Sequence, residues 1–257
     1  DVETLNASKT AVFGDCLLSA AFLSYAGAFT FDYRKEMMDD LFLPDVQARK
    51  IPLTLPFSLV SLMATDAEVQ HWGADGLPSD EHSTQNGIIT VNSSRFPLCI
   101  DPQEQAVAWI KNKESPNNLT IKTLNDSDFM KHLELAVQFG NPFLFEGIDE
   151  ELDPMIDPVL EKNFTIQGAS KFVKMGDKMV EWDDNFRLFF TTKLANPHYV
   201  PEICIKCTII NFTVTLSGLE DQLLVEVISN ERLDLQQKSD ELVVSLAGYN
   251  KQLKDIE

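Results

Sequence analysis

The 257-residue sequence is poor in basic residues, with 21 Lys and Arg against 40 Asp and Glu, which leaves a formal net charge of −19. It contains no run of Lys or Arg. A surface this acidic repels phosphate backbones, anionic lipid headgroups and other acidic polymers. We therefore expect neither nucleic acid nor a membrane surface as a partner. The 44% share of hydrophobic residues is that of an ordinary globular protein.

Cysteine is also scarce. The four cysteines, Cys16, Cys99, Cys204 and Cys207, lie in apolar stretches, and we expect them to be reduced, buried and cytosolic. Cys204 and Cys207 have CxxC spacing, but a zinc ribbon needs a second pair, and a thioredoxin-like site needs a helix that starts after a strand. Neither context is present, so we expect no metal or redox site.

Residues 11–31 carry Asp15 as their only charge and approach the length of a membrane span. Ser19, Ser24 and Tyr25 make this stretch only moderately apolar, and no positive cluster flanks it. We expect a helix buried within soluble protein. The chain begins without Met in a helix-like run and ends within another, which suggests a piece of a larger protein.

Helical spacing continues through the first third of the chain. It predicts helices over residues 33–49 and 58–71, separated by a loop at 51–57 that Pro52 and Pro56 interrupt. Residues 73–87, with the sequence GADGLPSDEHSTQNG, are predicted to form a loop. The periodicity changes after Gly87.

From residue 88 onward, short apolar runs alternate with helical stretches, which is typical of a parallel sheet covered by helices. The predicted strands are residues 96–100, 119–124, 142–145, 186–192 and 207–212, and the helices between them include 102–113 and 128–139. Gly140 is expected to end the second helix. Two alternating runs in residues 164–182 are separated by Gly176 and Asp177, which predicts a β-hairpin insertion.

The C-terminal segment has a different spacing. Its apolar residues form a heptad-like seam of Leu235, Leu242, Leu246, Tyr249, Leu253 and Ile256. A seam of this kind usually pairs with another long helix. A core helix of the same domain is the alternative, because two to three heptads do not separate the two interpretations.

The turn after the first predicted strand determines whether a phosphate could bind at its usual place in such a fold. Its sequence is IDPQEQA at residues 100–106. It has no glycine for close approach of the backbone and no lysine to reach a phosphate, and Asp101 and Glu104 would repel one. Phosphate binding is therefore disfavoured at this turn.

Glu146 follows the third predicted strand and precedes further acids in residues 149–153. An acid in that position could orient a hydrated magnesium ion, or the acidic run could favour a helix N-terminus or contact a neighbour. The four histidines are scattered, and neither a G-x-S-x-G nor an H-E-x-x-H motif occurs. No catalytic residues are predicted.

Taken in order, long stretches of the chain resemble the dynein heavy chains, and within them the fifth AAA+ module of the motor ring. The matching segments are GDCLLSAAFLSYAGAF at 14–29, HWGADGLPSD at 71–80, NGIITVNSSRFPLCIDPQEQAVAWI at 86–110, GNPFLFEGIDEELDPMIDPVL at 140–160, and FRLFFTTKLANPHYVPEICIKCTIINFTVTLSGLEDQLL at 186–224. The resemblance covers essentially the whole chain and is closer to axonemal than to cytoplasmic forms.

The resemblance implies an α/β, three-layer AAA+ domain like those of P-loop proteins, with a five-stranded, mainly parallel sheet, a hairpin insertion and a long C-terminal helix. It divides the chain into three parts. Residues 1–85 would lead from the stalk into the module, residues 86–217 would form a degenerate AAA+ core with the hairpin at 164–182, and residues 218–257 would begin the strut, or buttress, coiled coil.

By the same resemblance, Asp101, Pro102 and Gln103 stand where an active module has its Walker A loop. Glu146 lies near the Walker B acids, and Asn196 matches the sensor-one asparagine. These positions would be vestigial, so the module would bind no cofactor, while ATP and Mg²⁺ would bind in other modules of the motor. Lys206 falls near an arginine-finger position, but lysine lacks the planar fork of arginine. The competing interpretation of Lys206 is a solvent-facing charge at a strand edge.

The expected function is mechanical: a non-catalytic module that relays ATP-driven ring movements to the strut and stalk in a ciliary axoneme. Its partners would be the neighbouring AAA+ modules and the stalk coiled coil, without direct contact to the acidic microtubule. The alternative is an active nucleotide-binding module with an unorthodox site that uses Asp101, Glu146 and Asn196.

Overall fold

The computed structural model describes residues 2–168 and 170–232, together with 238, 242 and 245. The chain divides into two compact units. The first comprises Asp1–Phe22, Thr30–Ile88 and Val214–Glu257, and the second comprises Leu23–Phe29 and Ile89–Thr213. Within the described residues, no helix combines the length and the apolar character that a bilayer span requires.

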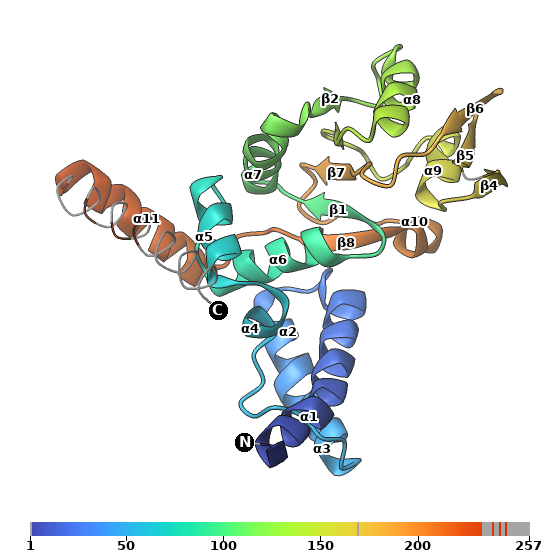
Figure 1. Cartoon of the computed structure of the whole chain (residues 1–257). Coiled ribbons are helices and arrows are strands. Elements are labelled where there is room, and N and C mark those ends of the chain that lie inside the picture. Colours follow the sequence, from blue (N-terminus) through green and yellow to red (C-terminus); the bar gives the residue numbers. More distant parts are fainter. Residues whose placement is uncertain (1, 169, 233–237, 239–241, 243–244, 246–257) are drawn as a thin grey trace. The chain divides into compact units, whose positions relative to one another are not determined.

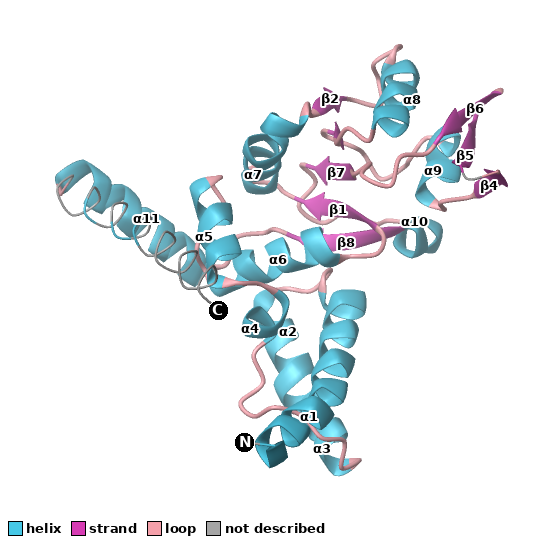
Figure 2. Ribbon diagram, viewed as in Figure 1, coloured by secondary structure: helices cyan, strands magenta, loops and turns pink. Residues whose placement is uncertain are grey.

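The first unit is helical (Figure 2). Its elements are α1 (Val2–Ala21), α2 (Phe31–Glu36), the π-helical η2 (Met37–Phe42), α3 (Leu43–Ala48), α4 (Leu59–Met63), α5 (Asp66–Ala74), most of α6 (Glu81–Asn92) and α11 (Leu216–Glu231). The expected helical segment at 33–49 and the loop at 51–57 are confirmed. The only charge of the 11–31 stretch, Asp15, is buried, and its carboxylate accepts hydrogen bonds from Thr54 N (2.8 Å) and Thr54 Oγ1 (2.7 Å).

Two helix boundaries differ from the sequence prediction. The single helix expected at 58–71 is interrupted, because Thr65 and Glu68 form a capping box that starts α5 after α4 has ended. The loop expected at 73–87 is confirmed only for residues 75–80, because α5 extends to Ala74 and α6 begins at Glu81. Asp80 caps α6: its carboxylate accepts hydrogen bonds from Ser83 N (2.9 Å) and Ser83 Oγ (2.7 Å).

The second unit is built on five parallel strands: β1 (Phe96–Ile100), β2 (Thr120–Lys122), β3 (Phe143–Phe145), β7 (Leu188–Thr192) and β8 (Cys207–Asn211). Their order in the sheet is β2-β3-β7-β1-β8, and every neighbouring pair is parallel (Figure 1). The α/β class and the five predicted strands are confirmed. Side chains on both faces of β1, β3 and β7 are buried, as is typical of a parallel sheet covered on both sides.

Helices connect the strands of this sheet. They are α7 (Gln105–Glu114) with η3 (Ser115–Asn117), α8 (Phe129–Phe139), η4 (Pro154–Ile156), α9 (Asp157–Leu160) and α10 (Pro201–Lys206). Gly140 ends α8 with a φ of 68°, as predicted. On one face of the sheet, Phe145 lies within a cluster of buried rings that includes Phe129, Phe143 and Phe190.

The predicted insertion is larger than a hairpin. Strands β5 (Ser170–Met175) and β6 (Lys178–Glu181) form the expected hairpin around Gly176, which has a φ of 59°. A further strand, β4 (Phe164–Gln167), pairs with β5, so the insertion is a three-stranded antiparallel sheet. Its buried side chains Val173, Met175 and Val180 extend the core of the second unit.

The π-helical η1 (Phe22–Ala26) leads into a short segment that lies along β8. Asn211 N donates a hydrogen bond to Gly27 O (2.8 Å). A Cβ added at Gly27 would lie 2.4 Å from Ile209 O, so only glycine permits this close approach.

The prediction that all four cysteines are buried is wrong for two of them. Cys99 and Cys207 are buried in β1 and β8, whereas Cys16 and Cys204 are exposed, and all four are free thiols. Cys16 lies on the exposed side of α1, and Cys204 lies on the short helix α10. An apolar sequence neighbourhood does not determine which side of a helix faces solvent.

Candidate functional site at the carboxyl edge of the sheet

The carboxyl ends of the parallel strands lie at one edge of the sheet, where folds of this class commonly bind ligands. The Asp101 turn, residues 101–104, connects β1 to α7 at this edge. The carboxylate of Asp101 is buried, with 1% of the residue exposed. It accepts hydrogen bonds from Gln105 N (2.9 Å) and Val107 N (2.9 Å), in the first turn of α7.

Burial raises the pKa of Asp101, because a charge is costly in a poorly hydrated site. The backbone N–H groups of Val107, Gln105 and Ala106 oppose this shift by stabilising the charged form. The N-terminus of a helix carries partial positive charge and is a common place for an anion. In this protein, the N–H groups of Gln105 and Val107 already donate to the carboxylate of Asp101.

Glu104 completes the Asp101 turn in the left-handed region, with a φ of 60°. Its exposed carboxylate forms an ion pair with Lys193, the residue that follows β7. This contact lowers the pKa of Glu104 and raises the pKa of Lys193. The second acid of the turn is therefore paired with a cation of the chain.

Glu146 follows β3 directly and is also paired. Its Oε2 lies 2.7 Å from Lys111 Nζ, which belongs to α7. Glu146 was predicted from the sequence as a site residue, whereas Lys193 and Lys111 were not. Lys193 could have been predicted as a site residue from its position directly after a strand. Lys111 could not, because it reaches Glu146 only where α7 passes close to the end of β3.

The remaining positions named from sequence lie at the same edge. Pro102 is half-buried and Gln103 is exposed within the Asp101 turn, and Asn196 is exposed in the segment after β7. Lys206 lies elsewhere, at the end of α10 before β8 begins. Its ammonium pairs with Asp157 (2.9 Å) and Glu161 (3.1 Å), so Lys206 is an ion-paired residue rather than a solvent-facing charge.

An acidic segment after Glu146 lines an open pocket of about 760 Å³. Asp149, Glu150, Glu151 and Asp153 are among its lining residues, and Glu150 Oε1 accepts a hydrogen bond from His198 N (2.7 Å). Within residues 2–168 and 170–232, no three His, Cys, Asp or Glu side chains are grouped closely enough to hold a metal ion.

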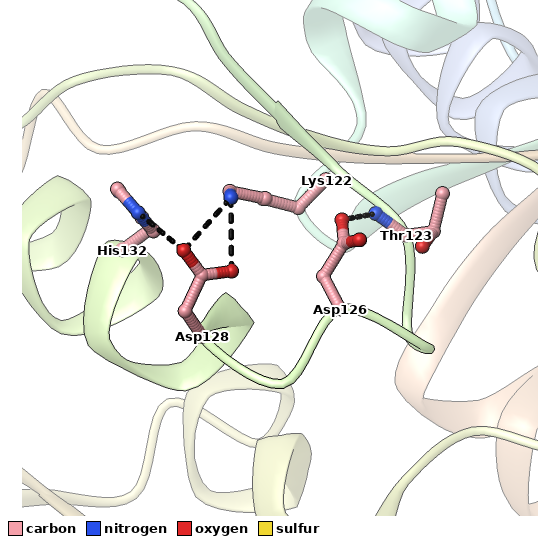
Figure 3. A network of polar contacts seen from close by, with 5 residues as sticks. All are labelled: Lys122, Thr123, Asp126, Asp128 and His132. Carbon is pink, nitrogen blue, oxygen red and sulfur yellow. Dashed lines mark hydrogen bonds and ion pairs between the residues drawn. The ribbon is translucent and has the colours of Figure 1, made fainter.

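A network of polar contacts lies in the connection from β2 to α8, at the same edge of the sheet. Figure 3 shows that Lys122 and His132 both contact the carboxylate of Asp128. Lys122 Nζ lies 2.9 Å from Asp128 Oδ1, and His132 Nε2 lies 3.0 Å from Asp128 Oδ2. In the same connection, the carboxylate of Asp126 accepts a hydrogen bond from Thr123 N (2.8 Å). Lys122 is the main cause of the lowered pKa of Asp128. This network was not predicted from the sequence, although the four-residue spacing of Asp128 and His132 indicates contact on one helix face.

The C-terminal seam lies almost entirely outside the described residues. Leu242 is described and is exposed. The other seam positions, Leu235, Leu246, Tyr249, Leu253 and Ile256, fall among the residues that the structure does not describe.

Comparisons with known proteins agree on one family. A family model described as the ATP-binding dynein motor region matches residues 70–257. Over its whole length the chain is 50% identical to "Dynein axonemal heavy chain 10" of Homo sapiens and 51% identical to "Dynein-1-alpha heavy chain, flagellar inner arm I1 complex" of Chlamydomonas reinhardtii. Over 95% of its length it is 45% identical to "Dynein axonemal heavy chain 6" of Homo sapiens. The chain spans about 6% of the length of each of these relatives.

Proposed function

This chain belongs to the family of ATP-binding dynein motor regions, and we propose that it is a non-catalytic AAA+ module of an axonemal dynein heavy chain. Within the motor ring it is the fifth module, and its location is the ciliary axoneme. Its partners are the neighbouring AAA+ modules and the stalk coiled coil of the same heavy chain. It binds no cofactor itself, while ATP and Mg²⁺ bind in other modules.

The observation that carries this proposal is the carboxylate of Asp101 on the N-terminus of α7. A nucleotide phosphate would need the same N–H groups, which Gln105 and Val107 donate to Asp101 at 2.9 Å. An incoming phosphate would also meet the negative charges of Asp101 and Glu104. Glu146, the acid that would orient Mg²⁺, is already paired with Lys111.

The proposed work of the module is mechanical. A module that does not hydrolyse ATP can still move as a rigid body when its neighbours change state. We assign residues 1–85 to the path from the stalk into the module and residues 218–257 to the start of the strut. Movement of the ring then reaches the stalk through the strut and changes the affinity of the motor for microtubules.

An equilibrium binding experiment tests the absence of nucleotide. The 257-residue chain is titrated with a fluorescent ATP analogue in the presence of Mg²⁺. We expect no saturable signal. Saturation at micromolar concentration would refute the proposed absence of nucleotide and would favour the alternative, an active site built from Asp101, Glu146 and Asn196.

A second experiment tests the relay in the intact motor. Leu242, Leu246 and Leu253 are replaced by alanine, with the exposed polar position Lys238→Ala as the matched control. We expect the leucine variant to keep its basal ATPase rate but to lose much of the stimulation by microtubules. Unchanged stimulation in the leucine variant would refute the relay. An equal loss of stimulation in Lys238→Ala would show that the effect is not specific to the leucine seam.

A further inference from the structure

Three cations that are far apart in the sequence meet at the amino edge of the parallel sheet. Arg95 directly precedes β1 and Arg187 directly precedes β7, and these two strands pair in parallel with Leu98 opposite Phe190. The same register, continued to the strand starts, places Arg95 beside Arg187. Lys162, shortly after α9, lines the same pocket of about 290 Å³, the cationic pocket. The sequence has no run of basic residues, so tertiary structure alone creates this pocket.

Two of the three cations are held in place by the chain itself. Arg95 Nη1 donates to two backbone carbonyl groups of α10, at 3.1 and 3.0 Å. Lys162 Nζ donates to Ser94 O (2.8 Å) and lies 5.0 Å from the centroid of the Phe96 ring. Side chains that are already fixed lose little conformational freedom when a ligand binds, so the cationic pocket is preorganised.

The charges of the three cations are not neutralised within the part of the chain that the structure describes. Seven other lysines of the second unit form ion pairs there, but none of the three does. Of the described acids, Asp184 alone lines the cationic pocket, and it is paired with Lys171 (2.7 Å). Arg187 acts on the buried Glu114 at longer range, but that carboxylate is already bonded to two other side chains. A local positive charge therefore remains in a chain of net charge −19.

A second pocket continues from the first. It has a volume of about 500 Å³, shares three residues with the cationic pocket and is lined by Leu160 and Ile205. Ile205 is 70% exposed, so this Ile205 pocket offers an apolar contact. Its acids are Glu161, which is paired with Lys206 (3.1 Å), and Glu202. An acidic group therefore fits the first pocket better than the second, and an apolar group fits the second.

We propose that the cationic pocket and the Ile205 pocket together form a docking site for an acidic segment of another protein. Its Asp or Glu side chains contact the two guanidinium groups, which suit carboxylates because they donate paired hydrogen bonds. An apolar side chain of the same segment packs on Ile205. A small anion would use the cationic pocket alone, whereas a short polypeptide spans both. The docking site lies at the amino edge of the sheet, away from the Asp101 turn, so it goes beyond the proposed function and does not depend on it.

Fluorescence anisotropy tests this proposal directly. The 257-residue chain is titrated into a labelled decapeptide with the central sequence DELDE, at constant ionic strength. We expect saturable binding with a Kd below about 200 μM. A peptide with NQLNQ at its centre should not bind, and one with DESDE should bind at least about threefold more weakly because it lacks the leucine. Absence of saturable binding to DELDE overturns the proposal.

Substitutions locate the site. Arg187→Gln removes an exposed guanidinium group, and we expect it to weaken binding of the DELDE peptide at least about tenfold. Arg95→Gln should do the same, but it also removes contacts to α10, so Arg187→Gln alone decides if Arg95→Gln does not fold. Lys174→Gln is the matched control, because Lys174 is an exposed cation of the same unit that lines neither pocket. Equal losses in Lys174→Gln and Arg187→Gln would show unspecific attraction and overturn the proposal.

Competing ligands distinguish the other occupants. Equal affinity for the DELDE and DESDE peptides would show a site for anions only. Tighter binding of a single-stranded oligonucleotide, lost in Arg187→Gln, would make nucleic acid the occupant. Self-association of the chain that the DELDE peptide reverses would make a second copy the occupant. Each of these three results overturns the proposal.

Discussion

Two buried layers of this protein are made of opposite kinds of side chain. The sheet of the second unit is lined by aromatic and aliphatic residues such as Phe143, Phe145 and Phe190, which are 0% exposed. In the first unit, by contrast, α6 buries five consecutive polar residues: His82, Ser83, Thr84, Gln85 and Asn86. The first layer is stabilised by removal of apolar surface from water, whereas the second depends on specific partners.

Two of the five buried polar residues of α6 contact residues from distant parts of the sequence. Asn86 Oδ1 accepts a hydrogen bond from Arg34 Nη2 (2.7 Å), although the two residues are 52 positions apart. His82 lies edge-on to Phe31, with ring centroids 6.0 Å apart. Arg34 is itself buried at 1% exposure, and desolvation lowers its pKa to about 9. In such a polar core, a missing partner leaves a buried polar group unsatisfied, which has a cost of its own beside the lost contact.

The largest effect is expected in the apolar layer. Phe145→Ala removes a ring that contacts Phe129, Phe143 and Phe190, and we expect the free energy of unfolding to fall by about 3–5 kcal/mol. Phe139→Ala, at a position that is 65% exposed, is the control and should change it by less than about 0.5 kcal/mol. Denaturant unfolding measures both, and similar losses would contradict the assignment of the core.

An intermediate effect is expected in the polar layer. Asn86→Ala removes the acceptor that faces Arg34 Nη2, and we expect a loss of about 1.5–3 kcal/mol, as is typical of a buried hydrogen bond to a charged group. Asn230→Ala, at an exposed position on α11, should lose clearly less in the same unfolding measurement. A loss at Asn86 no larger than that at Asn230 would break the contrast between the two layers.

The smallest perturbation changes no residue and uses the four thiols as probes. Burial raises the pKa of Cys207 to about 12, and Cys99 is also buried with a raised pKa. We expect iodoacetamide to modify the exposed Cys16 and Cys204 quickly at pH 8, and to modify Cys99 and Cys207 only after denaturation. Mass spectrometry of the modified peptides identifies the sites. Rapid modification of Cys99 in the folded protein would contradict its burial in β1.

The same raised pKa predicts a pH dependence. The unfolded thiol of Cys207 ionises near its ordinary value of 9.0, whereas the folded thiol keeps its proton up to about 12. Its contribution to stability is therefore complete below pH 9 and is lost as the pH rises through about 12. Cys207→Ala should make the fall in stability between pH 9 and pH 12 less steep, and an unchanged slope would contradict this assignment.

The sequence prediction was accurate for the apolar layer and less accurate for the polar layer. All five strands of the parallel sheet were located from their apolar runs, and in β1, β3 and β7 burial on both faces leaves little room for polar residues. The polar start of α6 was predicted as a loop, because its residues are typical of exposed turns. The Asp80 cap explains why a helix starts there, and the contacts with Arg34 and Phe31 help to explain why its polar side chains are buried.

The candidate site was predicted in part. The acids Asp101, Glu104 and Glu146 were named from their positions in the sequence, and Asp101 and Glu104 were expected to repel phosphate. The contact between Asp101 and α7 was not predicted, because it depends on how the turn folds back on the helix. The pairing of Glu146 with Lys111 was missed for the same reason, since the two residues are 35 positions apart in sequence.

The sequence by itself determined the α/β class, the positions of the five parallel strands, the acidic character and the family, because each depends on local patterns of hydrophobicity and charge or on extended similarity. Tertiary structure alone decided which polar groups are buried and which acids are paired with which cations. Hydrogen bonds and ion pairs act over a few ångströms in space, and residues at that separation can be far apart along the chain. The position of the Asp101 carboxylate on α7 is a property of that kind.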